Sequence, residues 1–191
     1  MSTDTLSRFF ASLALFTFAA TVVVIALVIA GRMRPDSGAA AFVDDVAANS
    51  LWLGMIVAAV TTAGSLYYSL GAHFTPCELC WYQRICVYPL SVVLLIAALR
   101  RDFGVWRYGL PPALVGIVIA AYHSQLQAFP TQATFCSLTN PCTIRYVWQF
   151  GFVSLPLMDL AALIFITAML LLARAHERQI DSAFAIEVTP T

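Results

Sequence analysis

A Cys-x-x-Cys motif lies between two long apolar segments in the stretch Pro76-Cys77-Glu78-Leu79-Cys80-Trp81-Tyr82-Gln83-Arg84. Two thiols separated by two residues can close a disulfide or share a metal ion, and both reactions need thiolate character at one sulfur. The unpaired backbone N–H groups at the start of a helix favour a thiolate there. Arg84 follows Cys80 by one helical turn and adds a positive charge on the same face. The motif therefore predicts redox chemistry at the edge of a membrane.

The composition is that of an integral membrane protein. Of the 191 residues, 61% are hydrophobic and 10% are charged, so polar side chains are too few to cover a water-soluble globule. Several apolar runs exceed the roughly 18 residues that a transmembrane helix needs. The formal net charge is zero and every basic residue is an arginine. We therefore expect a lipid bilayer as the environment, with no nucleic-acid partner and no polybasic lipid anchor.

Five apolar segments are long enough to span the bilayer: residues 9–30, 51–70, about 80–99, 110–126 and 152–173. We expect an all-α integral membrane protein that consists of a four-helix transmembrane bundle plus one additional N-terminal transmembrane helix. Residues 1–50 would hold the additional helix and a connecting loop, with a short interfacial helix around 39–48. Residues 51–173 would form the bundle, and residues 174–191 a poorly ordered cytoplasmic tail.

The first apolar segment has one alternative interpretation, a cleaved signal peptide. The small residues at 37–41 could form a cleavage site. The apolar region is too long for a signal peptide, however, and the segment before it has only Arg8 against Asp4. We therefore interpret this segment as a transmembrane helix.

The arginines are divided unequally between the two sides of the predicted bundle. One side has seven: Arg32, Arg34, Arg100, Arg101, Arg107, Arg174 and Arg178. The other side has three: Arg8, Arg84 and Arg145. Cytoplasmic loops carry an excess of basic residues, so we expect the carboxyl terminus in the cytoplasm. The amino terminus and the loop cysteines would then face outward, where disulfides persist.

The segment Cys77-Glu78-Leu79-Cys80-Trp81-Tyr82-Gln83-Arg84 resembles the first periplasmic loop of the DsbB family of disulfide-bond-forming quinone reductases. It is most similar to the short-loop branch with a Cys-x-x-Cys-Trp-Tyr-Gln-Arg signature, found also in Gram-positive bacteria. The resemblance covers about residues 51–173, where the order of spans and cysteine pairs is the family's own. The helix at 9–30 is additional to the family's four, and it preserves their topology if the amino terminus is outside.

The resemblance implies two redox-active pairs. Cys77 and Cys80 match the family's quinone-linked pair, and Cys136 and Cys142 match the pair that exchanges with a soluble oxidant. The implied activity is that of a membrane thiol:quinone oxidoreductase, which reoxidises a DsbA-like thioredoxin-fold protein and passes the electrons to ubiquinone or menaquinone. The implied location is the bacterial inner membrane, with the cysteine loops extracytoplasmic.

Three polar residues near the predicted membrane edges need separate interpretation. Arg84 and His123 match the basic residues that the family places around the quinone, His123 through the shorter motif at 122–127. The planar guanidinium of Arg84 could hold a quinone carbonyl and favour a thiolate at Cys80. Alternatively, Arg84 reaches the lipid headgroups and His123 is an ordinary interface residue. Asp159 stays unassigned: it could cap the final helix or lie near the headgroups.

Other interpretations of the cysteines stay open. Cys77 and Cys80 could form a static disulfide or half of a four-cysteine zinc site in a non-enzymatic membrane sensor. Cys136 and Cys142 could close a loop staple without turnover. An enzyme similar to vitamin K epoxide reductase would also couple cysteine pairs to a quinone, although there we would expect the loop pair first in the chain. Cys86, inside the third span, is expected to be inert.

Overall fold

The computed structural model describes residues 3–132, 136 and 140–188. Six α-helices make up most of this part of the chain: α1 (Thr3–Met33), α2 (Gly38–Ala48), α3 (Ser50–Leu66), α4 (Glu78–Arg100), α5 (Trp106–Ala128) and α6 (Leu155–Val188). A π-helical segment, η1 (Tyr67–Gly71), continues α3, and a 3-10 turn, η2 (Phe103–Val105), precedes α5. Residues 137–139 of the predicted exchange loop and 189–191 of the predicted tail lie outside the described residues.

Five helical segments are long and apolar enough to cross a membrane: Thr3–Met33, Ser50–Gly71, Glu78–Arg100, Phe103–Ala128 and Leu155–Ala185. This confirms the predicted fold class, an all-α membrane bundle with one additional N-terminal helix. α2, with 11 residues, is too short to span and lies where the interfacial helix was expected.

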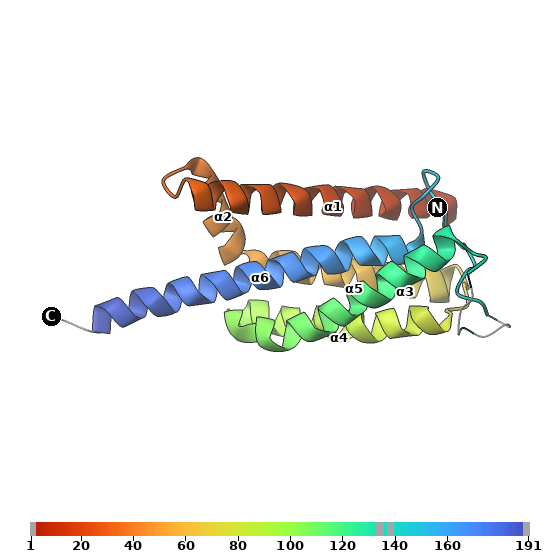
Figure 1. The fold of residues 1–191 in the computed structure, drawn as a ribbon. Coiled ribbons are helices and arrows are strands. Elements are labelled where there is room, and N and C mark those ends of the chain that lie inside the picture. The colour runs from red at the N-terminus through yellow and green to blue at the C-terminus, as the bar shows by residue number, and fades with distance from the viewer. Residues whose placement is uncertain (1–2, 133–135, 137–139, 189–191) are drawn as a thin grey trace.

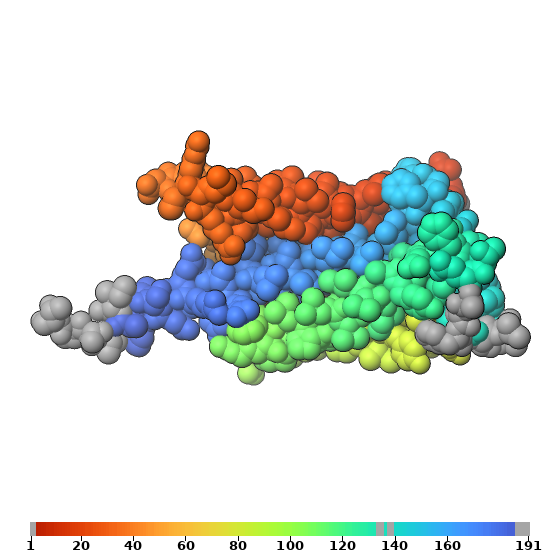
Figure 2. All heavy atoms as spheres, viewed as in Figure 1, coloured from red at the N-terminus to blue at the C-terminus, as the bar shows by residue number. Residues whose placement is uncertain are grey.

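The helices α3 to α6 pack against one another as a bundle, and α1 lies beside α6 at its periphery (Figure 1). α2 crosses from the end of α1 to the start of α3. The amino terminus and the two connections that carry the loop cysteines lie at one end of the bundle, whereas the carboxyl terminus lies at the opposite end. Figure 2 shows α1 as a separate layer that rests on α6. The amino terminus and the cysteine loops therefore lie on the same side of the bundle, as expected from the sequence.

Small residues allow α1 to approach its neighbours closely. Its buried positions include Ser7, Ala11, Thr17 and Thr21, which recur at helical spacing on one face. The hydroxyls of Ser7, Thr17 and Thr21 each donate to a backbone carbonyl four residues earlier, so no polar group on this face is left without a partner. Small side chains at helix interfaces are typical of membrane proteins, in which packing rather than water exclusion drives association.

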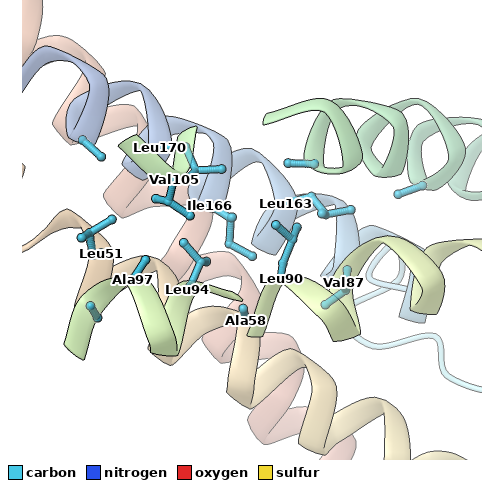
Figure 3. Packing of buried hydrophobic residues seen from close by; sticks show 14 residues of the cluster. Leu51, Ala58, Val87, Leu90, Leu94, Ala97, Val105, Leu163, Ile166 and Leu170 are labelled. Carbon is cyan, nitrogen blue, oxygen red and sulfur yellow. The ribbon is translucent and has the colours of Figure 1, made fainter. Parts of the chain in front are cut away.

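The core of the bundle is formed by apolar side chains of α4 and α6 together with α3 and α5 (Figure 3). Leu90 and Leu94 of α4 meet Leu163 and Ile166 of α6, and all four are almost completely buried. Gly116 of α5 permits this contact, because a Cβ there would lie 2.9 Å from Leu163 Cδ1. The close packing fixes how α4, α5 and α6 present their outer ends to the cysteine loops.

The prediction of a poorly ordered tail from residue 174 was wrong. α6 continues to Val188 without interruption. Contacts with the start of α5 stabilise this extension: Glu177 forms an ion pair with Arg107 at 2.7 Å and accepts a hydrogen bond from Trp106 Nε1 at 2.7 Å. The ring of His176 also packs on Phe103. These partners are far away in sequence, so the local composition of the tail did not reveal them.

Asp159 does not cap α6. α6 begins at Leu155, which places Asp159 in the second turn of the helix. Its Oδ2 atom is shielded from solvent inside the bundle.

Candidate functional site

The Cys-x-x-Cys pair lies at the start of α4. Cys77 is the N-cap residue, and its Sγ accepts a hydrogen bond from the backbone N–H of Cys80 over 3.3 Å. The two sulfurs are 2.7 Å apart and are not joined as a disulfide. An N-cap sulfur lies where the unpaired N–H groups and the helix dipole favour negative charge. The predicted thiolate therefore has a structural basis at the first cysteine of the motif.

The pKa of the Cys77 thiol is lowered to about 4, mainly by its hydrogen bond with the Cys80 thiol. Burial opposes this shift, and His123 contributes to it. From the sequence we expected Arg84 to favour the thiolate at Cys80. The structure differs, because the helix N-terminus, the neighbouring thiol and the imidazole all converge on Cys77.

His123 connects the two cysteine pairs. It lies in the last turns of α5 and is 1% exposed. Its Nε2 lies 3.1 Å from the carbonyl oxygen of Cys142, which can only accept, so Nε2–H is the donor. The same nitrogen is 3.7 Å from Cys77 Sγ. Nδ1 lies 3.1 Å from the terminal amide of Gln83, whose NH2 group is the donor to it when the imidazole is neutral. His123 is thus a buried residue of the site and not an ordinary interface histidine.

Arg84 is held against α3. Its Nε donates to Ser65 Oγ at 3.1 Å, and its Nη2 donates to the Ser65 carbonyl at 3.2 Å. The guanidinium also lies 5.2 Å from the centre of the Trp81 ring, a cation–π distance. A side chain fixed by these contacts lines the interior of the bundle and does not simply reach the headgroups.

The loop cysteines Cys136 and Cys142 form a disulfide. Cys142 is 1% exposed and Cys136 is 7% exposed, and both pack in one cluster with Cys77. Asn140 Nδ2 donates to the carbonyl of Pro76 over 2.8 Å, which ties the loop to the residue before the motif. The structure therefore brings together the two pairs that the sequence separates by more than fifty residues.

The segment after the disulfide is fixed to the end of α5. Gln127 Nε2 donates to the carbonyl of Ile144 at 2.8 Å, and Arg145 Nε donates to the carbonyl of Gln127 at 2.6 Å. The Arg145 guanidinium stacks on Trp148 with 4.0 Å to the ring centre. These bonds orient the Cys142 carbonyl toward His123.

A largely apolar cavity of about 220 Å³ extends from the cysteine motif into the membrane-spanning part of the bundle. Its polar lining includes Cys77, Cys80, Gln83, Arg84, His123 and Asp159, together with hydroxyl-bearing side chains such as Ser65, Tyr68 and Tyr88. Its apolar lining comes from several helices and includes Leu13 and Ala14 of α1 and Val60 of α3. The additional N-terminal helix thus forms part of the cavity wall.

A metal ion would find three donors at this point. The ligand atoms of Cys77, Cys80 and His123 lie within 4.8 Å of one another. The other two sulfurs that a four-cysteine zinc site requires are joined in the loop disulfide. The described residues therefore assemble a dithiol and a histidine beside a disulfide.

The sequence interpretation missed two site residues. Gln83 belongs to the quoted motif and lies three residues after Cys80, on the same helix face, but we assigned it no role. Asp159 is a carboxylate inside an apolar span, which is itself a signal of function. Both line the cavity.

Comparisons with known proteins agree with this arrangement. The family model "Disulfide bond formation protein DsbB" matches residues 48–175. A "Probable disulfide formation protein" from Coxiella burnetii (strain RSA 493 / Nine Mile phase I) is 39% identical over 127 residues, which cover 65% of this chain and 86% of the relative. The "Disulfide bond formation protein C" of Bacillus subtilis (strain 168) is 37% identical over 131 residues, or 68% of this chain and 95% of the relative. No solved structure matches the chain significantly.

The matched residues comprise the bundle α3 to α6 and both cysteine pairs, and they leave out α1 and almost all of α2. The Cys-x-x-Cys pair precedes the loop pair in the chain, contrary to the order expected of an enzyme similar to vitamin K epoxide reductase. Because the family match covers the same helices that build the site, the chain belongs to the DsbB family of disulfide bond formation proteins and is a membrane thiol oxidoreductase.

Proposed function

We propose that this chain is a thiol:quinone oxidoreductase that reoxidises a DsbA-like thioredoxin-fold protein and passes the electrons to ubiquinone or menaquinone. The observation that carries the proposal is the continuous arrangement of loop disulfide, His123, cysteine pair and cavity. Electrons that move from a soluble partner to an acceptor dissolved in lipid need redox groups in this order.

The residues around the cavity fit a quinone. A quinone headgroup is a flat ring with two carbonyl oxygens, so its site needs apolar walls and a few hydrogen-bond donors. The cavity is largely apolar, and Arg84, which bonds Ser65 through Nε and Nη2 and has a further N–H group on Nη1, is the donor that would hold a carbonyl oxygen. His123 borders the same cavity. Cys77 and Cys80 border the same cavity. When bound, the quinone would take up two electrons and two protons.

The chain's own cysteines would perform a series of exchange steps. A thiolate of the partner attacks Cys136, which forms a mixed disulfide and releases Cys142 as a thiolate. Cys142 then attacks Cys77 of the oxidised Cys77–Cys80 pair, and Cys80 leaves. The partner's second thiolate displaces Cys136, so the partner departs as a disulfide, and Cys136 attacks Cys142, which re-forms the loop disulfide and releases Cys77. His123 is placed to orient the attack of Cys142 on Cys77, because Nε2 bonds the Cys142 carbonyl and lies 3.7 Å from Cys77 Sγ.

The proposed cycle passes through a state in which the Cys136–Cys142 disulfide has re-formed and Cys77 and Cys80 are free thiols, after two electrons have moved inward from the partner. A low pKa at Cys77 keeps this sulfur a good leaving group when the loop disulfide re-forms.

The proposed orientation places both pairs outside the cytoplasm, in the bacterial inner membrane. The amino terminus and the cysteine connections share one end of the bundle (Figure 1). That end has the smaller share of the arginines, three against seven. The carboxyl-terminal end of α6 would then lie in the cytoplasm.

The decisive experiment is an oxidation assay with purified protein in detergent. We expect it to oxidise a reduced thioredoxin-fold protein only when a quinone is added, with quinol formed in equal amount. A Cys86→Ala variant is the matched control, since Cys86 lies in α4 outside both pairs and should leave turnover unchanged. Oxidation that is independent of quinone would contradict the proposal. Zinc that copurifies with the reduced protein in equimolar amount, without any turnover, would favour the membrane sensor.

A further inference from the structure

We propose that Asp159 holds, as a neutral carboxylic acid, one of the two protons that a bound quinone takes up in the cavity. The inference rests on the proposed quinone-dependent function and assigns a role to a residue outside both cysteine pairs. It also makes α6 part of the chemical site rather than only a packing element.

Asp159 borders the cavity from the second turn of α6. Within the part of the chain that the structure describes, its Oδ2 is shielded from solvent and has no hydrogen-bond partner. The ion pairs found among these residues do not include it. The cation of the same cavity, Arg84, is engaged by Ser65 instead.

The polar neighbours of Asp159 lead back to the cysteines. Gln83 of α4 lies between His123 and Asp159: one atom of its terminal amide is 3.1 Å from His123 Nδ1, and the other faces the Asp159 carboxyl group. When the imidazole is neutral, the NH2 group donates to Nδ1, so the amide oxygen is left to accept from a protonated Asp159. Nε2 of His123 lies 3.7 Å from Cys77 Sγ. The other titratable neighbour is Cys86, one turn further along α4.

The surroundings of Asp159 favour a carboxyl group that keeps its proton. An ionised carboxylate without a cation is costly inside a membrane-spanning bundle, whereas the neutral acid is a hydrogen-bond donor. α1 covers one side of the cavity with Leu13 and Ala14, which keeps bulk water from that side. A proton needed inside the cavity is therefore best supplied by a group that already carries it.

The protons and electrons balance over one cycle. The partner's dithiol becomes a disulfide and gives up two electrons and two protons, and a quinone gains two of each when it becomes a quinol. In the reduced state Cys77 is a thiolate and Cys80 a thiol, so this pair supplies two electrons but one proton. Asp159 supplies the second proton, and the proton released when Cys77 became a thiolate restores the acid.

The first test separates proton supply from binding. Asp159→Asn keeps the shape and polarity of the side chain but has no acidic proton. We expect kcat for quinone reduction to fall about a hundredfold, in the range typical of general acid catalysis. The quinone KM should change little, and trapping of the partner on Cys136 in the Cys142→Ser background should be unchanged. Asp159→Glu should recover part of the lost rate.

The matched control is Thr167→Val in the same helix. Oγ1 of Thr167 is also buried and unpartnered, but Thr167 does not line the cavity. We expect normal quinone kcat in this variant. A normal quinone kcat in Asp159→Asn would overturn the proposal, as would an equal loss in both variants.

A second readout does not depend on turnover. Infrared difference spectra of the reduced protein should show a protonated-carboxyl band in the wild type that is absent in Asp159→Asn and displaced in Asp159→Glu. Failure to find such a band would also overturn the proposal. If the wild-type protein itself does not reduce quinone, the proposed function fails. If the wild-type protein reduces quinone and Asp159→Asn does so at the same rate, only the role of Asp159 is refuted.

Discussion

At the scale of single residues, we expect the charge of the reduced motif to reside on Cys77. Its pKa is lowered to about 4, first by the hydrogen bond with Cys80 and then by His123. Because the pKa lies below the ordinary value, Cys77 should be a thiolate throughout neutral pH and become protonated only as the pH falls through about 4. Thiolate absorbance measured against pH, in protein whose loop disulfide is intact, checks this.

Cys80→Ala should raise the midpoint of that titration, because it removes the hydrogen bond that contributes most to the shift. His123→Phe should raise it less. Cys86→Ala should leave it unchanged. A midpoint near the ordinary thiol value in the wild type would contradict the assignment of the thiolate to Cys77.

Arg84 is the second residue with a testable role, because its substitution should change the kinetics with quinone and not those with the partner protein. Arg84→Lys keeps the charge but loses the planar fork that now bonds Ser65, and Arg84→Met loses both. Losing one charge-assisted hydrogen bond costs roughly 1.5 to 3 kcal/mol, or about a tenfold to hundredfold loss in kcat/KM. We expect this loss for the quinone, larger in the methionine variant, with partner KM little changed. Unaltered quinone kinetics in Arg84→Met would assign Arg84 to packing alone.

At the scale of elements, α1 forms one wall of the cavity, and this helix lies outside the residues that match the DsbB family. It is fastened near the cysteine end, where Tyr68 donates to Ser7 Oγ over 3.1 Å and the ring of Phe10 contacts Gly64. Gln149 Nε2 also bonds Asp4 at 2.9 Å. The helix therefore has fixed contacts beside the site as well as along α6.

A larger side chain on the inner face of α1 should narrow the cavity. Ala14 lines it, so we expect Ala14→Trp to raise the quinone KM about tenfold while thiol exchange with the partner stays normal. Phe16→Trp is the matched control, because Phe16 is 69% exposed on the outer face of the same helix. Equal quinone KM values in the two variants would show that α1 does not limit the space that the cavity offers to the quinone.

At the scale of the whole molecule, both cysteine pairs and the amino terminus lie at one end (Figure 1). Single cysteines in an otherwise cysteine-free chain test which side this end faces. Thr131→Cys at the exposed cysteine end should react with an impermeant maleimide in intact cells. Asp36→Cys, exposed at the other end, should react only after the membrane is opened. The reverse pattern would invert the proposed orientation and remove the oxidising role.

The sequence determined the elements of this protein. Membrane spans follow from length and apolarity, which are local properties, so all five were predicted. The spans predicted at 51–70 and 80–99 end within two residues of the helical segments, whereas α1 and α5 begin several residues earlier than predicted and α6 continues well beyond its predicted end. The alternation of spans also placed both cysteine pairs and the amino terminus together. Five of the six implied site residues, Cys77, Cys80, Arg84, His123 and Cys142, line one cavity, and Cys136 is bonded to Cys142.

Only the tertiary structure decided how these groups act on one another. The structure favours the thiolate at Cys77 rather than at Cys80, because the N-terminus of α4, the Cys80 thiol and His123 of α5 meet at one sulfur. The place of Asp159 beside Gln83 depends on how α6 packs on α4, and the cavity wall of α1 depends on small residues that fit α6. Contacts of this kind join residues far apart in the chain, and their distances are set by packing of the whole bundle, which no local pattern encodes.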